Sequence, residues 1–309
     1  MNFRLSKVNL AMYKRDEINR LSQLMLGVLG KPNVGKTTFF NAATSLSAQV
    51  ANFPFTTVSP NMGIANVRVT CVCREMNVTD TPSNSSCIDG NRLIPIRLVD
   101  VAGLVPDASR GRGLGNKFLD DVRQADALIH VVDASGSSDE EGRSCPPGSH
   151  DPVSDLEFVE KEFDTWMYGI LQKDWSYIAR SAESGTRKLT AALSEKLSGL
   201  KIGESEINAS ISALDLSKDK PNTWSKDDLF RFCRELRENS KPSLVVANKI
   251  DIESSSDNLI KLKGGGREVV ACAAEAEVML RRASEKGLIR YLPGDGDFEV
   301  SSKMTGDQE

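Results

Sequence analysis

The chain has 309 residues and a formal net charge of −4, and its hydrophobic (39%) and charged (27%) fractions are those of an ordinary globular protein. The length suffices for the core of one large or two modest domains, and the mildly acidic balance gives no overall attraction to nucleic acid. No apolar run approaches the roughly 20 residues that cross a bilayer, which argues against a membrane protein. Six cysteines without a secretory signal predict reduced thiols in the cytoplasm rather than a disulfide scaffold.

The first 24 residues are polar, with only loose helical spacing. Two interpretations stay open for them: a short helix packed on the domain, or an extension ahead of a start at Met25. The apolar run 25–30 predicts a buried strand. Further patterns predict helices over 36–44 and 116–125, strands over 64–71 and 92–100 joined by an elaborated hairpin loop, and a central parallel strand over 127–133.

The next part of the chain is helical in pattern. Residues 134–150 are rich in Ser, Gly, Pro and acid and predict a loop, after which Ser154 with Glu157 predicts a capped helix start. Helical spacing returns over 186–197 and 207–216, and Ser225 with Asp228 indicates another helix start. About a hundred residues therefore contain no convincing strand.

Strand patterns resume over 244–247 and 269–273, and a helix is expected over 275–285 with Gly287 at its end. This order predicts an α/β domain with a mostly parallel sheet, interrupted by an α-helical insertion. The expected divisions are an extension (1–24), a first part of the domain (25–135), the helical insertion (136–239) and a second part (240–309).

The loop after the first strand, GKPNVGKT, matches the phosphate-binding P-loop pattern in full. Its glycines allow the backbone to approach phosphate, Lys36 places a cation between the β- and γ-phosphates, and the hydroxyl of Thr37 is a Mg²⁺ ligand. We expect a nucleotide to contact Gly30, Asn33, Val34, Gly35, Lys36, Thr37 and Thr38.

Two further motifs follow strands. In Asp100-Val101-Ala102-Gly103, Asp100 would hold Mg²⁺ through water and the Gly103 N–H would contact the γ-phosphate. In the NKID motif at 248–251, the Asp251 carboxylate can accept hydrogen bonds from guanine N1–H and the N2 amino group, whereas adenine offers neither. The motif order predicts a GTP-binding domain whose nucleotide also contacts Asn248 and Lys249, and it argues against a metabolic kinase.

Together these motifs resemble the Obg-related YchF family of translation-factor-class P-loop GTPases, most closely its archaeal branch. The resemblance rests on GVLGKPNVGKTTFFNAAT, NFPFTTVSPNMG, DVAGLV followed by GRGLGNKFLDD, ADALIHVVDAS, NKID and ACAAEAE, and it spans about 25–298. It implies a Ras-like G domain with a helical insertion, slow GTP hydrolysis as a molecular switch, and the ribosome or ribosomal RNA as partner. The alternatives are a nucleotide-dependent binding module with negligible hydrolysis and an ATP-using member of the family. The oligomeric state is left open.

The resemblance also assigns roles to single residues. Thr57 matches the switch threonine that contacts Mg²⁺ and the γ-phosphate, with Thr56 as the alternative, so the expected metal set is Thr37, Thr57 and Asp100 and the expected catalytic set is Lys36, Thr57 and Gly103. Ala273 and Ala274 match the loop at the guanine edge. Relatives that use ATP often lack the last acid of the guanine motif, so the retained Asp251 argues for GTP.

Two departures from the family pattern stand out. The chain ends at Glu309, before the TGS domain that usually follows, which suggests a fragment, a truncated gene or a shortened lineage. In the hairpin where archaeal relatives carry a cysteine cluster, only Cys71, Cys73 and Cys87 are present, with Asp80 as a candidate fourth ligand. A tetrahedral Zn²⁺ site is one interpretation; we favour free thiols.

Some residues bear on the rate and on the core. Leu104 occupies the position where Ras-like enzymes orient water with glutamine, which predicts slow intrinsic hydrolysis. Asn33 either helps to hold K⁺ beside the phosphates or only braces its loop. His130, in an apolar strand, is expected in the core, and His150, in a loop, is expected to be solvated.

Overall fold

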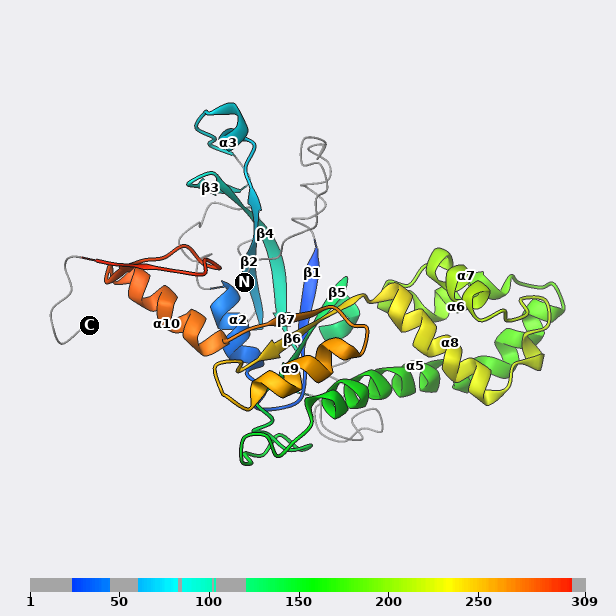
Figure 1. Cartoon of the computed structure of the whole chain (residues 1–309). Coiled ribbons are helices and arrows are strands. Elements are labelled where there is room, and N and C mark those ends of the chain that lie inside the picture. The colour runs from blue at the N-terminus through cyan, green and yellow to red at the C-terminus, as the bar shows by residue number, and fades with distance from the viewer. Residues whose placement is uncertain (1–23, 45–60, 83–84, 102, 104–120, 302–309) are drawn as a thin grey trace.

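The computed structural model describes residues 24–44, 61–82, 85–101, 103 and 121–301. Its centre is a seven-stranded sheet in the order β2-β4-β1-β5-β6-β7, with β3 also paired to β4 (Figure 1). Five strands, β4, β1, β5, β6 and β7, run parallel to one another, while β2 and β3 are antiparallel to β4. The strands are β1 (Met25–Leu29), β2 (Met62–Thr70), β3 (Ser86–Ile88), β4 (Asn91–Asp100), β5 (Ala127–Asp133), β6 (Ser243–Asn248) and β7 (Val269–Ala271). The predicted α/β class with a mostly parallel sheet is confirmed.

Helices cover both faces of this sheet. Because side chains alternate along a strand, neighbouring residues of β5 enter different cores. Val131 lies in a core with residues of α2 (Lys36–Thr44) and α10 (Ala274–Glu285), whereas Val132 lies with residues of α5 and α9 (Ser255–Gly264). Coverage on both faces explains why β5 is apolar almost throughout. His130 is buried in this strand, as predicted.

A helical lobe projects from the sheet on α5 (Pro152–Glu183), a helix of 32 residues (Figure 1). The first turns of α5 pack on the sheet, and its later turns share a second core with the other lobe helices. These are α6 (Leu189–Leu197), η4 (Ser198–Leu200), α7 (Glu204–Ala213), η5 (Pro221–Thr223) and α8 (Lys226–Ser240). A buried ion pair, Arg237 Nε to Asp164 Oδ1 at 2.7 Å, joins α8 to α5 before the chain returns to the sheet.

The helix ends differ in part from expectation. The Ser225–Asp228 capping box is present, and Gly287, with φ of +69°, follows α10 as predicted. The predicted cap at Ser154 was wrong. The N-cap of α5 is Asp151, whose carboxylate accepts from the Val153 N–H at 3.0 Å, while Pro152 takes the first helical position that suits its fixed φ.

The remaining elements are short. They are α3 (Cys73–Met76) and the two-stranded pair β8 (Ile289–Arg290) with β9 (Glu299–Val300). Within the described part of the chain, no helix combines the length and the apolar character needed to cross a membrane.

Candidate functional site

The carboxyl ends of the parallel strands meet at one edge of the sheet, where ligands bind in open α/β folds. The P-loop follows β1 there and leads into α2. Asp100, Asp133 and Asn248 are the last residues of β4, β5 and β6. The topology therefore brings the three sequence motifs to the same edge.

Backbone shape at the P-loop depends on its glycines. Gly30 and Gly35 have φ of +147° and +91°. An added Cβ would lie 2.3 Å from the Val131 carbonyl oxygen at Gly30 and 2.3 Å from Asn248 Nδ2 at Gly35. Val34 is fully buried and anchors the loop, whereas Asn33, with φ of +63°, is exposed. The resulting backbone leaves room for a close approach of phosphate.

A cation, a hydroxyl and a carboxylate lie next to this loop. The Thr37 hydroxyl donates to Asp100 Oδ2 at 2.9 Å, and Lys36 Nζ donates to the Lys31 carbonyl oxygen at 2.6 Å. A Cβ on Gly103 would lie 3.1 Å from Lys36 Nζ, so Gly103 adjoins the same ammonium group. Burial lowers the pKa of Lys36 to about 8, against the opposing influence of Asp100. Hard oxygen donors beside a buried ammonium suit a triphosphate with Mg²⁺.

The NKID loop is bound to the P-loop through Asn248. Its side-chain Nδ2 donates to the Val34 carbonyl oxygen at 2.9 Å, and its Oδ1 accepts from the Ala274 N–H at 3.0 Å. The Ile250 N–H donates to the Cys272 carbonyl oxygen at 3.3 Å, which holds the NKID loop against the loop that carries Ala273. Asp251 is exposed at this junction.

Lys249 contacts an aspartate that the motif search did not single out. Its Nζ donates to Asp133 Oδ2 at 2.7 Å and to Ser137 Oγ at 3.2 Å. Asp133 is buried, and burial alone would raise its pKa; the hydrogen bonds from Lys249, Ser135 and Ser138 outweigh burial and lower the pKa. Its position at a strand end was the only feature of the sequence that could have indicated it.

A buried triad behind the P-loop was also missed. Lys31 Nζ lies 2.9 Å and 2.7 Å from the two carboxylate oxygens of Asp155 and donates to the Ser138 carbonyl oxygen at 2.7 Å. His150 Nε2 lies 2.7 Å from Asp155 Oδ1, with its side chain only 12% exposed. The predicted solvated His150 was therefore wrong, because the loop folds back onto α5.

The same loop contacts the exposed side of the P-loop. Asn33 Nδ2 donates to the Gly142 carbonyl oxygen at 2.7 Å, and a Cβ on Gly142 would lie 2.7 Å from the Pro32 carbonyl oxygen. Residues 134–150 thus brace the P-loop on two sides, although their composition predicted only a connection. The predicted site residues Thr56 and Thr57, and Leu104, lie outside the described residues. Thr38 is half-buried in the first turn of α2.

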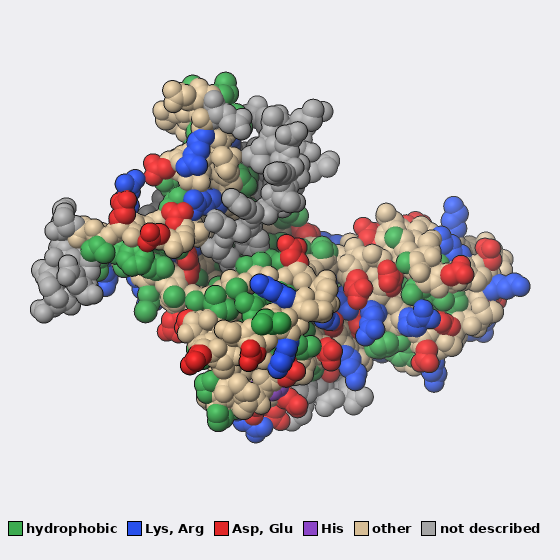
Figure 2. Space-filling view, in the orientation of Figure 1, with side chains coloured by type: hydrophobic (Ala, Val, Ile, Leu, Met, Phe, Trp, Pro, Cys, Tyr) green, Lys and Arg blue, Asp and Glu red, His purple; other side chains and the backbone are tan. Residues whose placement is uncertain are grey.

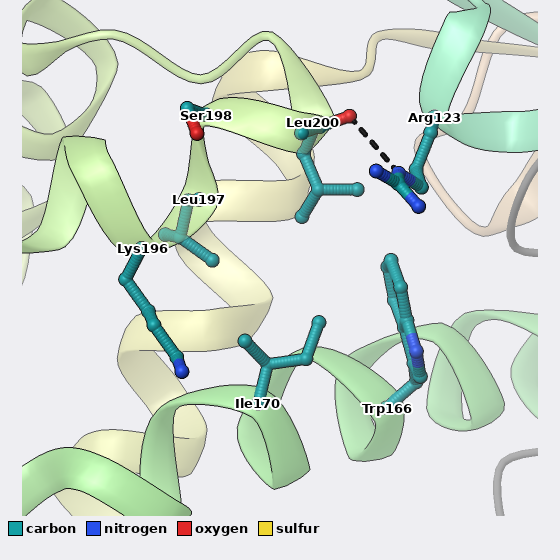
Figure 3. A pocket seen from close by; sticks show the side chains of 8 residues that line it. Arg123, Trp166, Ile170, Lys196, Leu197, Ser198 and Leu200 are labelled. Carbon is teal, nitrogen blue, oxygen red and sulfur yellow. Dashed lines mark hydrogen bonds between the residues drawn. The ribbon is translucent and has the colours of Figure 1, made fainter.

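A separate hollow of about 390 Å³ lies in the helical lobe (Figure 3). Arg123 closes one side of it by donating from Nε to the Gly199 carbonyl oxygen at 3.2 Å, and Trp166 and Ile170 of α5 form its floor. Its lining contains no carboxylate and no glycine-rich loop, so it lacks the groups that bind phosphate and Mg²⁺.

Comparison with known proteins identifies the family. Residues 25–152 match the family model described as 50S ribosome-binding GTPase, and residues 246–309 match the Obg-like GTPase YGR210-like, G4 motif-containing domain. A GTP-binding protein of Methanocaldococcus jannaschii is 46% identical over 89% of this chain and 69% of its own length. The ribosome-binding ATPase YchF of Bacillus subtilis is 31% identical over 82% of this chain and 66% of its own length.

Two solved structures of GTP-binding proteins are similar to this chain. The crystal structure of a GTP-binding protein from Pyrococcus horikoshii is 38% identical, with a TM-score of 0.72 over 87% of this chain and 70% of that one. The Schizosaccharomyces pombe YchF GTPase is 25% identical, with a TM-score of 0.50 over 85% and 70%. This chain therefore spans about two thirds of the length of these relatives. With the P-loop and the NKID loop joined at one sheet edge, the chain belongs to the YchF-type family of Obg-like, P-loop GTP-binding proteins.

Proposed function

We propose that the protein binds GTP with Mg²⁺ and hydrolyses it slowly, as a molecular switch that acts on the translation machinery in the cytoplasm. The observation that carries the proposal is the double hydrogen bond of Asn248, which holds the NKID loop against the P-loop and the Ala274 backbone. A base held at Asp251 and a triphosphate held at the P-loop would then belong to one nucleotide.

Different groups of the chain would bind the phosphates, the metal and the base. The P-loop amides and Lys36 would bind the phosphates, and Thr37, Thr57 and Asp100 would hold Mg²⁺ directly or through water. Bound there, the metal would neutralise charge on the β- and γ-phosphates. Lys36, Thr57 and the Gly103 N–H would stabilise charge on the transferred phosphoryl group, while the amides near Ala273 and Ala274 would face the base.

A bacterial relative is named a ribosome-binding ATPase, so ATP use is the serious alternative. We expect GTP to bind at least about tenfold more tightly than ATP, because one well-placed carboxylate supplies the 1.4 kcal/mol that a tenfold difference requires. In Asp251→Asn, GTP should lose that advantage and xanthosine triphosphate, whose 2-oxo group is an acceptor, should gain it.

Calorimetric titration with GTP, ATP and xanthosine triphosphate measures this effect. The matched control is Asp257→Asn, which removes the same charge from an exposed position in α9 and should leave the preference for GTP unchanged. Equal affinity of the wild type for GTP and ATP would contradict the assignment of Asp251 to the base.

Turnover is expected to be slow, well below the median of about 10 s⁻¹ for enzymes, because Leu104 offers no polar atom to orient water. The contact of Asn33 with Gly142 supports a bracing role, and in that case KCl and NaCl at equal ionic strength should give the same rate. A faster rate in KCl that is lost in Asn33→Ala would instead assign Asn33 to a K⁺ site. Phosphate release from GTP in the two salts is the measurement, and fast turnover in both would contradict the prediction drawn from Leu104.

The ribosome as partner rests on the names of relatives, which describe ribosome binding. The face shown in Figure 2 carries Lys and Arg interspersed with Asp and Glu over the helical lobe, so a single basic patch does not mark an RNA surface there. Co-sedimentation with ribosomes in GTP, in GDP and without nucleotide tests the proposal. Phosphate release that ribosomes do not accelerate, together with sedimentation that nucleotide does not alter, would favour a binding module without switching.

A further inference from the structure

The tip of the β2–β4 hairpin, residues 71–90, has almost no apolar core. It lies beyond the end of β2 and contains α3 and β3 (Figure 1). Among its described residues, Cys71 is the only buried hydrophobic side chain, whereas Met76 and Val78 are 67% and 57% exposed. Apolar burial is the main stabilising contribution in a small unit, so this tip needs another source of stability.

In place of an apolar core, the tip brings three cysteine sulfur atoms close together. The Cys71 N–H donates to the Gly90 carbonyl oxygen at 2.9 Å, and β3 pairs with β4, so Cys87 comes beside the turn that carries Cys71 and Cys73. The three Sγ atoms lie within 4.8 Å of one another, with Cys73 and Cys87 at 3.6 Å. Asp80 adds a carboxylate oxygen 3.2 Å from Cys71 Sγ.

These separations fit one tetrahedral ion. Zn–S bonds of about 2.3 Å and a Zn–O bond of about 2.0 Å require S–S edges of about 3.8 Å and S–O edges of about 3.5 Å. The 3.6 Å and 3.2 Å contacts agree with these edges to within a few tenths of an ångström. An iron–sulfur cluster binds its thiolates through separate iron atoms and would hold them further apart.

Arginines flank the candidate ligands. Three thiolates and a carboxylate carry more negative charge than one Zn²⁺ neutralises, so nearby cations and oriented partners are expected. Arg92 Nη1 lies 3.5 Å from Asp80 Oδ2, and its Nε donates to Ser85 Oγ at 2.9 Å. Arg74 packs against Gly90 and donates to the Asp89 carbonyl oxygen at 2.9 Å. The carboxylate is therefore held beside the sulfurs by a partner of its own.

We propose that Cys71, Cys73, Cys87 and Asp80 bind one structural Zn²⁺, which replaces an apolar core in the hairpin tip. The sequence favoured free thiols, because residue spacing alone does not show that the three sulfurs lie together. On binding, each thiol loses its proton to solvent and the thiolate coordinates the metal, with no change of oxidation state. The site is independent of the proposed GTP site. Ten residues of β4 separate the tip from Asp100, or about 30 Å at the rise of a strand.

The test uses the full chain purified without added chelator. Elemental analysis should give one Zn²⁺ per chain, and Cys87→Ser should lose most of it, while Cys145→Ser, which removes a half-buried thiol outside the cluster, should keep it. After Co²⁺ exchange, tetrahedral bands with thiolate charge transfer should appear. Asp80→Cys should raise the charge-transfer intensity by about one third, since three thiolates become four. GTP affinity should be unchanged in Cys87→Ser and Asp80→Cys, which would show that these chains are folded.

Several outcomes would overturn the proposal. They are a chain without Zn²⁺ that takes up no Co²⁺, a Zn²⁺ content that Cys87→Ser leaves intact, or a native mass lower by two hydrogens, as a Cys73–Cys87 disulfide requires. Unchanged Co²⁺ intensity in Asp80→Cys would remove Asp80 from the ligand set. If Cys87→Ser does not fold, amide exchange of the wild type decides. Removing the metal should speed exchange over 71–90 by at least about tenfold and leave α10 unchanged, and equal exchange with and without metal contradicts a structural role.

Discussion

Replacing Asp155 by alanine is expected to lower the free energy of unfolding by about 3–5 kcal/mol, the range for breaking a buried ion pair by removing one partner. The carboxylate of Asp155 contacts the Lys31 ammonium at 2.7 Å, and the two side chains are 4% and 0% exposed. Without it, Lys31 would keep only the Ser138 carbonyl oxygen as a hydrogen-bond partner, and His150 would lose its own contact. Urea unfolding followed by circular dichroism measures the change.

The matched control is an exposed pair. Glu195→Ala breaks the contact between Arg187 and Glu195, whose side chains are 44% and 66% exposed, and should cost no more than about 1 kcal/mol. Lys31→Met combined with Asp155→Leu should recover most of the loss, because it removes both charges and leaves neither unpaired. A cost for Asp155→Ala as small as that of the control would show that the triad behind the P-loop does not contribute to stability.

The contacts of this triad could not be predicted from the sequence. Lys31 occupies a variable position of the P-loop pattern and Asp155 is 124 residues away, so neither periodicity nor motif spacing relates them. The strands, the P-loop turn and the Ser225–Asp228 cap were predictable because each depends on residues within a few positions of one another. The prediction of the α5 cap was wrong because Asp151 and Ser154 are both good N-cap residues. Pro152 favours the first helical position, which makes Asp151 the N-cap.

The predicted site shows the same division. Parallel strands have their carboxyl ends at the same edge of the sheet, so the placement of Asp100 and Asn248 at one edge could be expected from the motifs. Other contacts depend on loop conformations that residue types alone do not determine. These are the hydrogen bonds of Asn248 with Val34 and Ala274, and that of Asn33 with Gly142. The sequence also could not predict the contact between Cys87 and Cys73 in the hairpin tip, because this contact depends on the pairing of β3 with β4.

Lys36→Ala is expected to weaken GTP binding by at least about a hundredfold. A hydrogen bond between charged groups contributes about 1.5–3 kcal/mol, and 2.8 kcal/mol corresponds to a hundredfold change. The ammonium is mostly buried and lies beside Gly103 and the Lys31 carbonyl oxygen, so solvent would not replace it. Lys263→Ala, at an exposed position near the end of α9, removes the same charge and should leave affinity unchanged. Full affinity in Lys36→Ala would contradict the assignment of the P-loop.

The pH dependence of binding gives an independent check on Lys36. Burial places its pKa at about 8 in the nucleotide-free chain, and the negative charge of a bound triphosphate should raise it. Below pH 8 the ammonium is charged before and after binding, so binding takes up no proton at this group. Above pH 8 binding must take up a proton, and affinity should fall by up to about tenfold per pH unit until the pKa of the complex is reached.

The measurement is calorimetry from about pH 7 to about pH 9.5, in buffers of different ionisation enthalpy, a range above the second pKa of about 6 of a phosphate group. Proton uptake should appear with the loss of affinity. Lys36→Arg is the matched variant, since a guanidinium stays charged throughout; its affinity can be lower, but the slope above pH 8 should vanish. The same slope in both proteins would assign the titration to another group and remove Lys36 from contact with the phosphates.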